Sequence, residues 1–222
     1  MRYVGPRQIV IDDKPAPVPF WTPDRAFEGQ TVVIVGGGPS HADIDLDALK
    51  GVRFIAINSA CRKVRPVATA EDILYFSDNS WSERFPGLLT DWPGPVVTSN
   101  RNTKARLGDA VRRLDLEPLV HTFQVMIDHV SASSGHAAAC LAAVMGAKRI
   151  VLIGFEGKFV NGQSHGHSDY RMQDAGPLAE RFVPGWFALA PAFDRLGVEV
   201  INATPDSAVT CFPVADLYEA IS

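Results

Sequence analysis

A run of β-branched residues followed by three glycines most constrains the fold of this chain. Residues 31–35 (TVVIV) lack the alternation of a half-exposed strand and are typical of a strand that is covered on both faces. Residues 36–40 (GGGPS) follow at once, and Pro39 suits a first helical turn because its missing N–H costs little there. The segment therefore predicts a buried parallel strand, a tight turn and a helix start.

The rest of the chain repeats this alternation of apolar segments and helical patterns. Buried strands are predicted at 53–57, 73–76, 149–153 and 198–202, shorter ones at 95–98 and 119–125, and helices at 135–145, 186–196 and 214–221. Strands separated by helical connections predict an α/β fold: a single Rossmann-like domain with a mostly parallel, doubly wound sheet and helices on both faces. Ligands bind such sheets at the carboxyl ends of the strands.

Residues 1–30 differ from this pattern and predict an irregular N-terminal leader. Prolines at positions 6, 15, 17, 19 and 23 argue against a helix, although residues 8–11 (QIVI) can add one edge strand. A chain of 222 residues fits one domain better than two, so we expect residues 31–222 to form a single nucleotide-binding domain.

Composition limits the classes of partner that the chain can bind and indicates the compartment in which it works. A net charge of −4 argues against general binding to nucleic acids or to anionic membrane surfaces. No segment approaches the roughly 18 apolar residues of a membrane span, and the N-terminus lacks a signal-peptide pattern. The three cysteines have no metal-ligand spacing and predict reduced thiols. We expect a cytoplasmic protein with a small-molecule ligand; the oligomeric state stays open.

The glycine-rich segment is the first candidate site. Glycines let backbone N–H groups approach an anion, and the helix start beyond them adds favourable dipole charge. The segment therefore predicts contact with a phosphate or nucleotide, the alternative being a tight turn without a ligand. The residues concerned are Gly36, Gly37, Gly38 and Ser40.

Two common nucleotide motifs are absent. No Gly-Lys-Ser/Thr ending of a P-loop occurs. The dinucleotide fingerprint fails because His41 takes the place of its third glycine and Asn58 that of its acidic residue. An NAD-dependent oxidoreductase is therefore not favoured.

Polar residues at the ends of two further strands are the next candidates. The amide of Asn58 can contact a ribose or a base, or it can cap the following turn. Asp78 can bind a hydroxyl or a metal, or it can cap the helix that begins near Ser80.

A serine cluster precedes the helix predicted at 135–145, whose alanines at 137–139, 142 and 143 should let it lie close to the sheet. Hydroxyls and a glycine before a helix make a second anion-friendly N-terminus, for which we select Ser133, Ser134 and Gly135. His136 is predicted to be a packed or a surface histidine and not a catalytic one.

The polar stretch 154–176 is too long for a simple connection and predicts a functional loop. His165 and His167 within it can supply a general base near neutral pH, or ligate a metal, or be inert. We expect one of the two to have a catalytic or substrate-binding role.

The order of these motifs resembles a known group. Gly-x-Gly-Pro-Ser, an Asn-ending second strand, Ser-Ser-Gly before an alanine-rich helix, and residues 146–156 (GAKRIVLIGFE) follow one another. This order, from about residue 31 to residue 207, resembles a Rossmann-like group that contains bacterial lipooligosaccharide sialyltransferases and archaeal 6-hydroxymethylpterin diphosphokinases. The ending at 196–207 (LGVEVINATPDS) also looks like the closing strand and loop of the sialyltransferases.

The resemblance implies roles for particular residues. It places the nucleotide of a CMP-sugar against residues 36–40, Asn58 and Ser134, and it makes His165 or His167 the nearest match to the general base. Two positions depart from the family pattern. Glu156 replaces an aspartate, and Tyr170 alone corresponds to a tyrosine pair that steadies the nucleotide phosphate.

The leading hypothesis is a nucleotide-dependent transferase, most like a glycosyltransferase, with a nucleotide-sugar donor and a histidine base. One alternative is an ATP-dependent diphosphokinase of a small alcohol, which would need Mg²⁺ on carboxylates such as Asp78, Glu156 or Asp169. Another is a non-catalytic nucleotide-binding or assembly protein. No metal is expected under the leading hypothesis.

Overall fold

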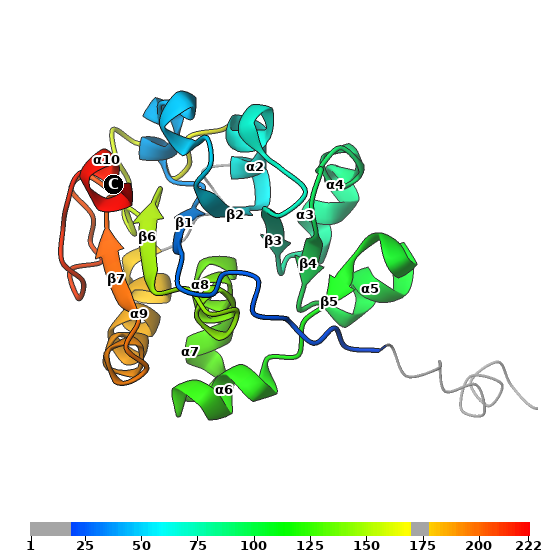
Figure 1. Ribbon diagram of the computed structural model, residues 1–222. Coiled ribbons are helices and arrows are strands. Elements are labelled where there is room, and N and C mark those ends of the chain that lie inside the picture. Colours follow the sequence, from blue (N-terminus) through cyan, green and yellow to red (C-terminus); the bar gives the residue numbers. More distant parts are fainter. Residues whose placement is uncertain (1–18, 170–177) are drawn as a thin grey trace, which may run out of the picture.

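One parallel sheet organises the chain in the computed structural model, which describes residues 19–169 and 178–222 (Figure 1). The sheet has seven strands in these residues, in the order β5-β4-β3-β2-β1-β6-β7. Their bounds are β1 Thr31–Val35, β2 Arg53–Ile57, β3 Ile73–Phe76, β4 Val96–Thr98, β5 Arg112–Arg113, β6 Arg149–Ile153 and β7 Glu199–Asn202. The predicted α/β fold class is confirmed.

Strand β1 lies where the strand order changes direction. It pairs with β2 on one side, Val33 opposite Phe54, and with β6 on the other, Val33 opposite Val151. The chain moves away from β1 toward β5 and then crosses back to β6 and β7. Such a switch point opens a crevice at the carboxyl ends of the two diverging strands.

Helices cover both faces of the sheet (Figure 1). Below it in Figure 1 lie α6 Glu117–Phe123, α7 Ile127–Ser131, α8 Ser134–Val144 and α9 Leu178–Arg195; the other side carries α2 Cys61–Val64, α3 Asn79–Arg84, α4 Pro86–Thr90 and α10 Leu217–Ile221, and α5 Arg101–Leu107 flanks β5. Short 3-10 segments are η1 Pro39–Asp43, η2 Leu46–Leu49, η3 Asn58–Ala60, η4 Arg65–Val67 and η5 Gly108–Ala110.

Side chains of each strand alternate between two cores. Val32 and Ile34 of β1 pack in the core on the side of α8 and α9, whereas Val33 and Val35 pack in the core on the opposite face. A continuous apolar run fits because both faces of the strand are covered. This explains why residues 31–35 lack a polar face.

Helix α8 packs directly on the centre of the sheet. It contacts β1, β2, β3 and β6, and α6, α7 and α9 cover its other sides. Every residue from Ser134 to Ala142 is buried. Alanines at 137–139 let the helix approach the strands closely, as the sequence predicts, and the close fit fixes the position of the serines at its N-terminus.

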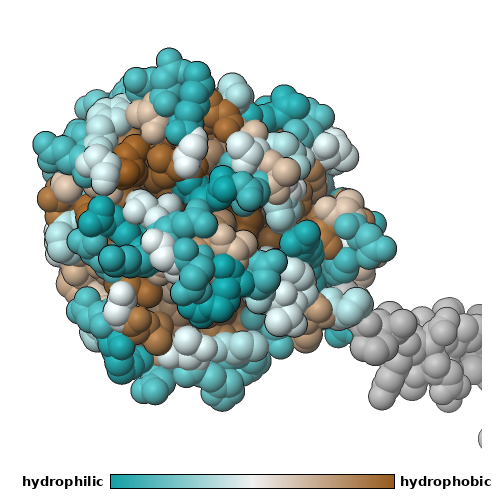
Figure 2. Space-filling model, viewed as in Figure 1, coloured by the Kyte–Doolittle hydropathy of each residue, from teal (hydrophilic) through white to brown (hydrophobic). Residues whose placement is uncertain are grey.

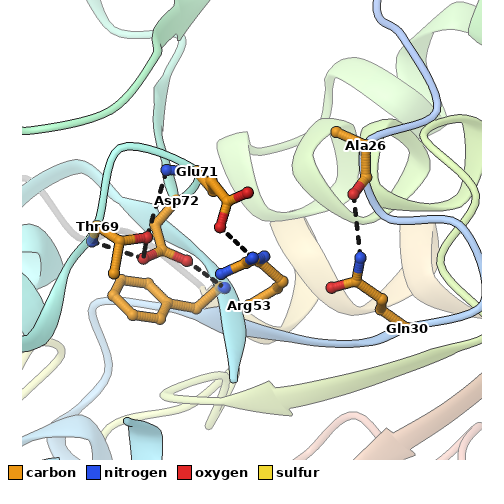
Figure 3. A network of polar contacts seen from close by, with 7 residues as sticks. Ala26, Gln30, Arg53, Thr69, Glu71 and Asp72 are labelled. Atoms are coloured by element: carbon orange, nitrogen blue, oxygen red, sulfur yellow. Dashed lines mark hydrogen bonds and ion pairs between the residues drawn. The ribbon is translucent and has the colours of Figure 1, made fainter. Parts of the chain in front are cut away.

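The amino ends of β2 and β3 are joined by a buried carboxylate (Figure 3). Asp72 Oδ1 accepts a hydrogen bond from Phe54 N at 3.1 Å, and Oδ2 accepts from Thr69 N at 2.7 Å and Thr69 Oγ1 at 2.8 Å. Beside it, Arg53 forms an ion pair with Glu71. Each oxygen of the carboxylate is satisfied, which a buried charge requires.

The prediction of a strand at residues 119–125 is wrong. This segment forms α6, with Pro118 in its first turn and Gln124 ending it in a left-handed conformation at φ 53°. Leu119 and Phe123 are buried four residues apart, which is a helical and not a strand spacing. Proline as a helix start was the missed signal.

The start of one helix also differs from the one expected. Helix α9 begins at Leu178, eight residues before the predicted start at 186, and includes Pro184 and Pro191. Residues 19–30 extend from the carboxyl end of β5, where Trp21 N donates to Arg113 O at 2.7 Å, to the start of β1, and Phe27 is fully buried. The edge strand suggested at 8–11 lies outside the described residues.

Hydrophilic side chains cover most of the face in Figure 2, with small hydrophobic patches between them. None of the helices in the described ranges has the length and apolar character needed to cross a bilayer. The cysteines at 61, 140 and 211 are free thiols. Burial raises the pKa of Cys61 to about 12 and that of Cys211 to about 11, which keeps both thiols protonated.

Candidate functional site

A cavity of about 630 Å³ lies at the carboxyl ends of β1, β2, β3 and β6. Its wall brings together segments that are far apart in the sequence: the glycine loop, the N-terminus of α8, and the loop that follows β6. The predicted site residues on this wall are Gly36, Gly37, Gly38, Asn58, Asp78, Ser133, Ser134, Gly135, Glu156, His165 and His167.

The glycines are required where the backbones of β1 and β6 stay in contact beyond the strands. Gly36 N donates to Ile153 O at 2.7 Å, and Gly38 N donates to Gly154 O at 2.9 Å. A side chain at Gly36 would place its Cβ 2.5 Å from Gly154 O. The glycine turn is therefore needed for this close approach, whether or not a ligand is bound.

The Glu156 carboxylate lies against the glycine loop, at the place where the sequence predicts a bound anion. Its Oε1 accepts a hydrogen bond from Ser40 N at 2.6 Å, and the residue is only 3% exposed. A Cβ on Gly38 would overlap the Glu156 carboxylate, so glycine at 38 makes room for it. Within the described ranges, Glu156 Oε2 has no hydrogen-bond partner.

Most amides of the loop are thus engaged inside the protein. Gly36 N and Gly38 N donate to main-chain oxygens, and Ser40 N donates to Glu156. The N–H of Gly37 makes no hydrogen bond with any described residue. The sequence places a phosphate here, but the structure leaves one loop amide for a ligand and puts a carboxylate beside it.

Asn58 and Asp78 lie at the ends of β2 and β3. Asn58 has a φ of 49°, which is unusual for a residue other than glycine, and it begins η3. Asp78 caps α3, with Oδ1 accepting from Ser80 N at 2.8 Å and Ser80 Oγ at 2.9 Å. Asp78 therefore has the capping role. Both Asn58 and Asp78 also line the cavity, where a ligand can reach them.

The serine cluster couples α8 to the sheet. Ser133 is the N-cap of α8, and its Oγ lies 2.7 Å from His136 Nδ1. Ser134 Oγ accepts a hydrogen bond from Ser77 N at 3.1 Å, which joins the N-terminus of α8 to the end of β3. The two hydroxyls are therefore held in fixed positions on the cavity wall.

His136 lies behind this wall and is packed, which is one of the two alternatives that the sequence leaves open. Its ring stacks on Trp186 with centroids 4.2 Å apart, and burial lowers its pKa to about 3. The imidazole is therefore neutral at physiological pH. It supports the N-terminus of α8 and does not reach the cavity surface.

The loop at residues 164–169, called here the histidine loop, packs on the glycine loop at residues 36–40. Gly166 N donates to Gly37 O at 2.9 Å, and His165 and His167 on either side face the cavity. Burial lowers the pKa of His165, with a further contribution from His41. Burial also lowers the pKa of His167 to about 4, and the neighbouring His165 adds to this. Both rings are neutral at pH 7.

Hydrogen bonds at Nδ1 distinguish the two histidines. Asp169 N donates to His167 Nδ1 at 3.3 Å, which leaves the proton of neutral His167 on Nε2. His165 Nδ1 lies 2.9 Å from Ser164 Oγ, which can either accept or donate the hydrogen bond between them. In the tautomer in which Nδ1 donates to Ser164, Nε2 of His165 carries the lone pair.

Two arginines hold the end of the histidine loop. Arg62 Nε forms an ion pair with Asp169 Oδ2 at 3.1 Å, and Arg84 donates to Asp169 O at 2.6 Å. Tyr170, the expected partner of a nucleotide phosphate, lies outside the described residues.

Sequence reasoning missed several residues of the cavity wall. They are Ser77, Ser80, Arg84, Phe155, Arg181, Phe182 and Trp186, among others. Arg84 had a weak signal, since it lies on the same short helix that Asp78 caps. Arg181 had none, because its distance from the other site residues depends on where α9 begins.

The three carboxylates selected for Mg²⁺ have other partners in the structure, although Asp78 and Glu156 line the same cavity. No three His, Cys, Asp or Glu side chains of residues 19–169 and 178–222 form a group that could hold a metal ion. Asp78 caps α3, Glu156 bonds to Ser40 N, and Asp169 pairs with Arg62.

Solved structures of sialyltransferases have a fold similar to that of this chain. The sialyltransferase CstII from Campylobacter jejuni, in complex with the substrate analogue cytidine-5'-monophosphate, is similar with a TM-score of 0.57 and 15% identity, over 86% of each chain. CstII in complex with CMP-3FNeuAc gives a TM-score of 0.55 at 14% identity, over 86% of this chain and 88% of that one. CST-II with a trisaccharide acceptor and CMP gives 0.53 at 15% identity, over 86% and 87%.

The similarity lies in the fold and not in the sequence. No protein-family model matches the chain, and no curated protein matches it. The chain has a sialyltransferase-like, Rossmann-like α/β fold.

Proposed function

We propose that this chain is a nucleotide-dependent glycosyltransferase that takes a nucleotide-sugar donor in the cavity and uses a histidine as general base. The observation that carries the proposal is the convergence of fixed hydroxyls, a glycine-lined floor and two neutral histidines on one cavity at the switch point. A volume of about 630 Å³ falls within the range of small-molecule sites, roughly 300–1,000 Å³. The solved neighbours of the same fold hold CMP or a CMP-sugar analogue.

The nucleotide contacts follow from the wall. Asn58 and Ser134 would donate and accept hydrogen bonds to the ribose or base, and Gly36–Gly38 would allow a close approach of the ligand to the backbone. Phe155 and Trp186 add apolar surface, and their rings meet edge to face with centroids 5.5 Å apart.

The chemical step requires one proton acceptor. His165 Nε2 would take the proton of the acceptor hydroxyl while that oxygen bonds to the anomeric carbon of the sugar. The bond from this carbon to the phosphate oxygen breaks, and the nucleotide leaves with the bonding electrons. A base with a lowered pKa stays unprotonated at neutral pH, which suits this role. His167, protonated at Nε2 when neutral, would instead donate a hydrogen bond within the site.

A transfer assay tests the proposal. The chain is incubated with CMP-, UDP- and GDP-sugars and a panel of sugar acceptors, and separately with ATP, Mg²⁺ and small alcohols. Each incubation is run with and without a chelator, and the release of free nucleotide is measured. We expect turnover with one donor class. Formation of AMP from ATP that stops on chelation would instead support the diphosphokinase alternative. Nucleotide binding without turnover of any donor would support the non-catalytic one.

A further inference from the structure

Two arginines on the cavity wall carry positive charge that no carboxylate of residues 19–169 or 178–222 neutralises. Arg84 lies at the end of α3 and Arg181 near the start of α9, and both are exposed. Neither forms an ion pair with a carboxylate of the described residues. Arg62 differs, because Asp169 neutralises it.

The two guanidinium groups are nevertheless held in place. Arg84 donates to Asp169 O at 2.6 Å and lies 5.1 Å from the centre of the Phe85 ring. Arg181 lies 5.0 Å from the centre of the Phe182 ring. Among the described residues, stacking on an aromatic ring and, for Arg84, one main-chain contact leave most N–H donors of each fork without a protein acceptor.

These arginines are the strongest attraction for an anion on the wall. No other Lys or Arg occurs among the described residues that line the cavity, and both cavity histidines are neutral at pH 7. A nucleotide phosphate entering the cavity therefore meets positive charge on α3 and α9.

The glycine loop offers the opposite environment. Glu156 already accepts from Ser40 N, and its second oxygen is buried without a partner among the described residues. A phosphate in this position would displace the carboxylate or lie against it, and two like charges in a buried site repel strongly. The usual location of a phosphate on a glycine loop is thus already filled by the protein.

We propose that Arg84 and Arg181, and not the glycine loop, bind the phosphate of the ligand. Guanidinium groups form paired hydrogen bonds to phosphate oxygens, so the two side chains provide the geometry as well as the charge. The inference rests on the proposed function in that it takes the ligand to be a nucleotide. In the transfer step, these arginines would stabilise the negative charge that develops on the departing phosphate.

Paired ligands isolate the contribution of the phosphate. Cytidine and CMP are titrated calorimetrically against the wild-type chain, Arg84→Gln, Arg181→Gln and the double variant. For each protein we take the Kd of cytidine divided by the Kd of CMP, which measures how much the phosphate adds to affinity. Each substitution should reduce this ratio about 10-fold, and the double variant about 100-fold, with cytidine affinity unchanged. The pairs uridine/UMP, adenosine/AMP and guanosine/GMP extend the test to other bases.

Two further variants separate this site from the glycine loop. Arg101→Gln removes an exposed cation outside the cavity and should leave the ratio unchanged. Glu156→Gln keeps an acceptor for Ser40 N and should change the ratio less than about threefold. A gain of 10-fold or more in Glu156→Gln, together with an unchanged ratio in the double arginine variant, would place the phosphate on the glycine loop and overturn the inference.

Inorganic phosphate distinguishes failure of the inference from failure of the proposed function. If phosphate binds and the double variant abolishes its binding, but no nucleoside or nucleotide binds, the arginine site stands and the proposed function fails. If CMP keeps its full advantage over cytidine in the double variant, the inference fails and the proposed function stands. Absence of binding of every probe contradicts both.

Discussion

Two buried carboxylates at opposite ends of the sheet differ in how far the protein satisfies them. Asp72, 1% exposed, lies at the amino ends of β2 and β3, and both of its oxygens accept hydrogen bonds. Glu156, 3% exposed, lies beyond the carboxyl end of β6, and only Oε1 has a partner in the described part of the chain. The first carboxylate is complete within the fold, and the second is not.

The surroundings of the two carboxylates repeat this difference. Asp72 O accepts from Trp92 Nε1 at 3.0 Å, and Thr69 closes the turn around its side chain. Glu156 lines a cavity whose wall also holds the Gly37 amide and two arginines that pair with no carboxylate in the described part of the chain. Polar groups that are fully bonded stabilise a fold, whereas incomplete ones at a cavity are typical of a binding site. Changes at the two ends should therefore affect different properties.

The largest effect is expected from the base. His165→Ala should lower turnover in the transfer assay by about 10²–10⁴-fold, because a positioned base contributes that much. The midpoint of thermal unfolding should hardly change. His167→Ala should lower turnover less than about 10-fold, and His121→Ala, an exposed residue of α6, should have no effect. Full activity of His165→Ala would remove this histidine from the mechanism.

Asp72→Ala should affect stability and not activity. It leaves Phe54 N, Thr69 N and Thr69 Oγ1 without their acceptor, and we expect a loss of about 3 kcal/mol in the free energy of unfolding, measured in urea. Turnover per folded molecule should stay at the wild-type value. Asp91→Ala, at an exposed carboxylate, is the control and should cost less than about 0.5 kcal/mol. If the Asp72→Ala variant is as stable as the wild-type chain, these hydrogen bonds do not stabilise the fold.

Gly38→Ala tests the close approach of the glycine loop to Glu156. The added methyl group would overlap the carboxylate and lie 2.8 Å from Gly154 O, and overpacking of this kind costs about 2 kcal/mol. Urea denaturation measures the loss. Gly87→Ala is the matched control, because nothing lies within 4 Å of its added methyl group. Equal stability of the two variants would contradict the fit between Gly38 and Glu156.

Removal of one charge sharpens the comparison further. Glu156→Gln should raise the free energy of unfolding by about 1 kcal/mol, because a buried charge with one unbonded oxygen opposes folding. Asp72→Asn removes the same charge and should lower the free energy of unfolding by a similar amount. The new side-chain N–H₂ group would face the N–H donors of Phe54 or Thr69 and could accept neither hydrogen bond. Changes of the same sign in both variants would show that the two carboxylates do not differ in this respect.

The smallest effect is expected from pH near neutrality. Burial and the neighbouring His41 lower the pKa of His165 below the usual value of about 6.5. A base must be unprotonated to act, so activity falls only when the pH drops below this lowered pKa. We expect kcat/KM at pH 6.5 to exceed half of its plateau value. If kcat/KM falls to half of its plateau value already at pH 6.5 or above, the assignment of His165 as base is wrong.

Local sequence patterns were enough to predict much of the fold. The β-branched run at 31–35 needs cover on both faces, and the alanines at 137–139 permit a close helix–sheet contact, so both predictions were confirmed. Segment 119–125 failed because a short apolar run fits a strand as well as a helix, and Pro118 was the only local sign of a helix start. Several candidate residues share one cavity because they follow parallel strands, whose carboxyl ends meet at one edge.

The sequence by itself thus determined the layered sheet and the edge of the sheet where polar residues gather, and it offered helix capping as one of two roles for Asp78. Only the tertiary structure decided that the carboxylate of Glu156, 116 residues from Ser40, lies against the glycine loop where the sequence predicts a bound anion. It also decided that Arg84 and Arg181 line the same cavity. Caps and strands depend on neighbours in the chain, whereas the sign of the charge at each wall depends on which distant segments the strand order brings together.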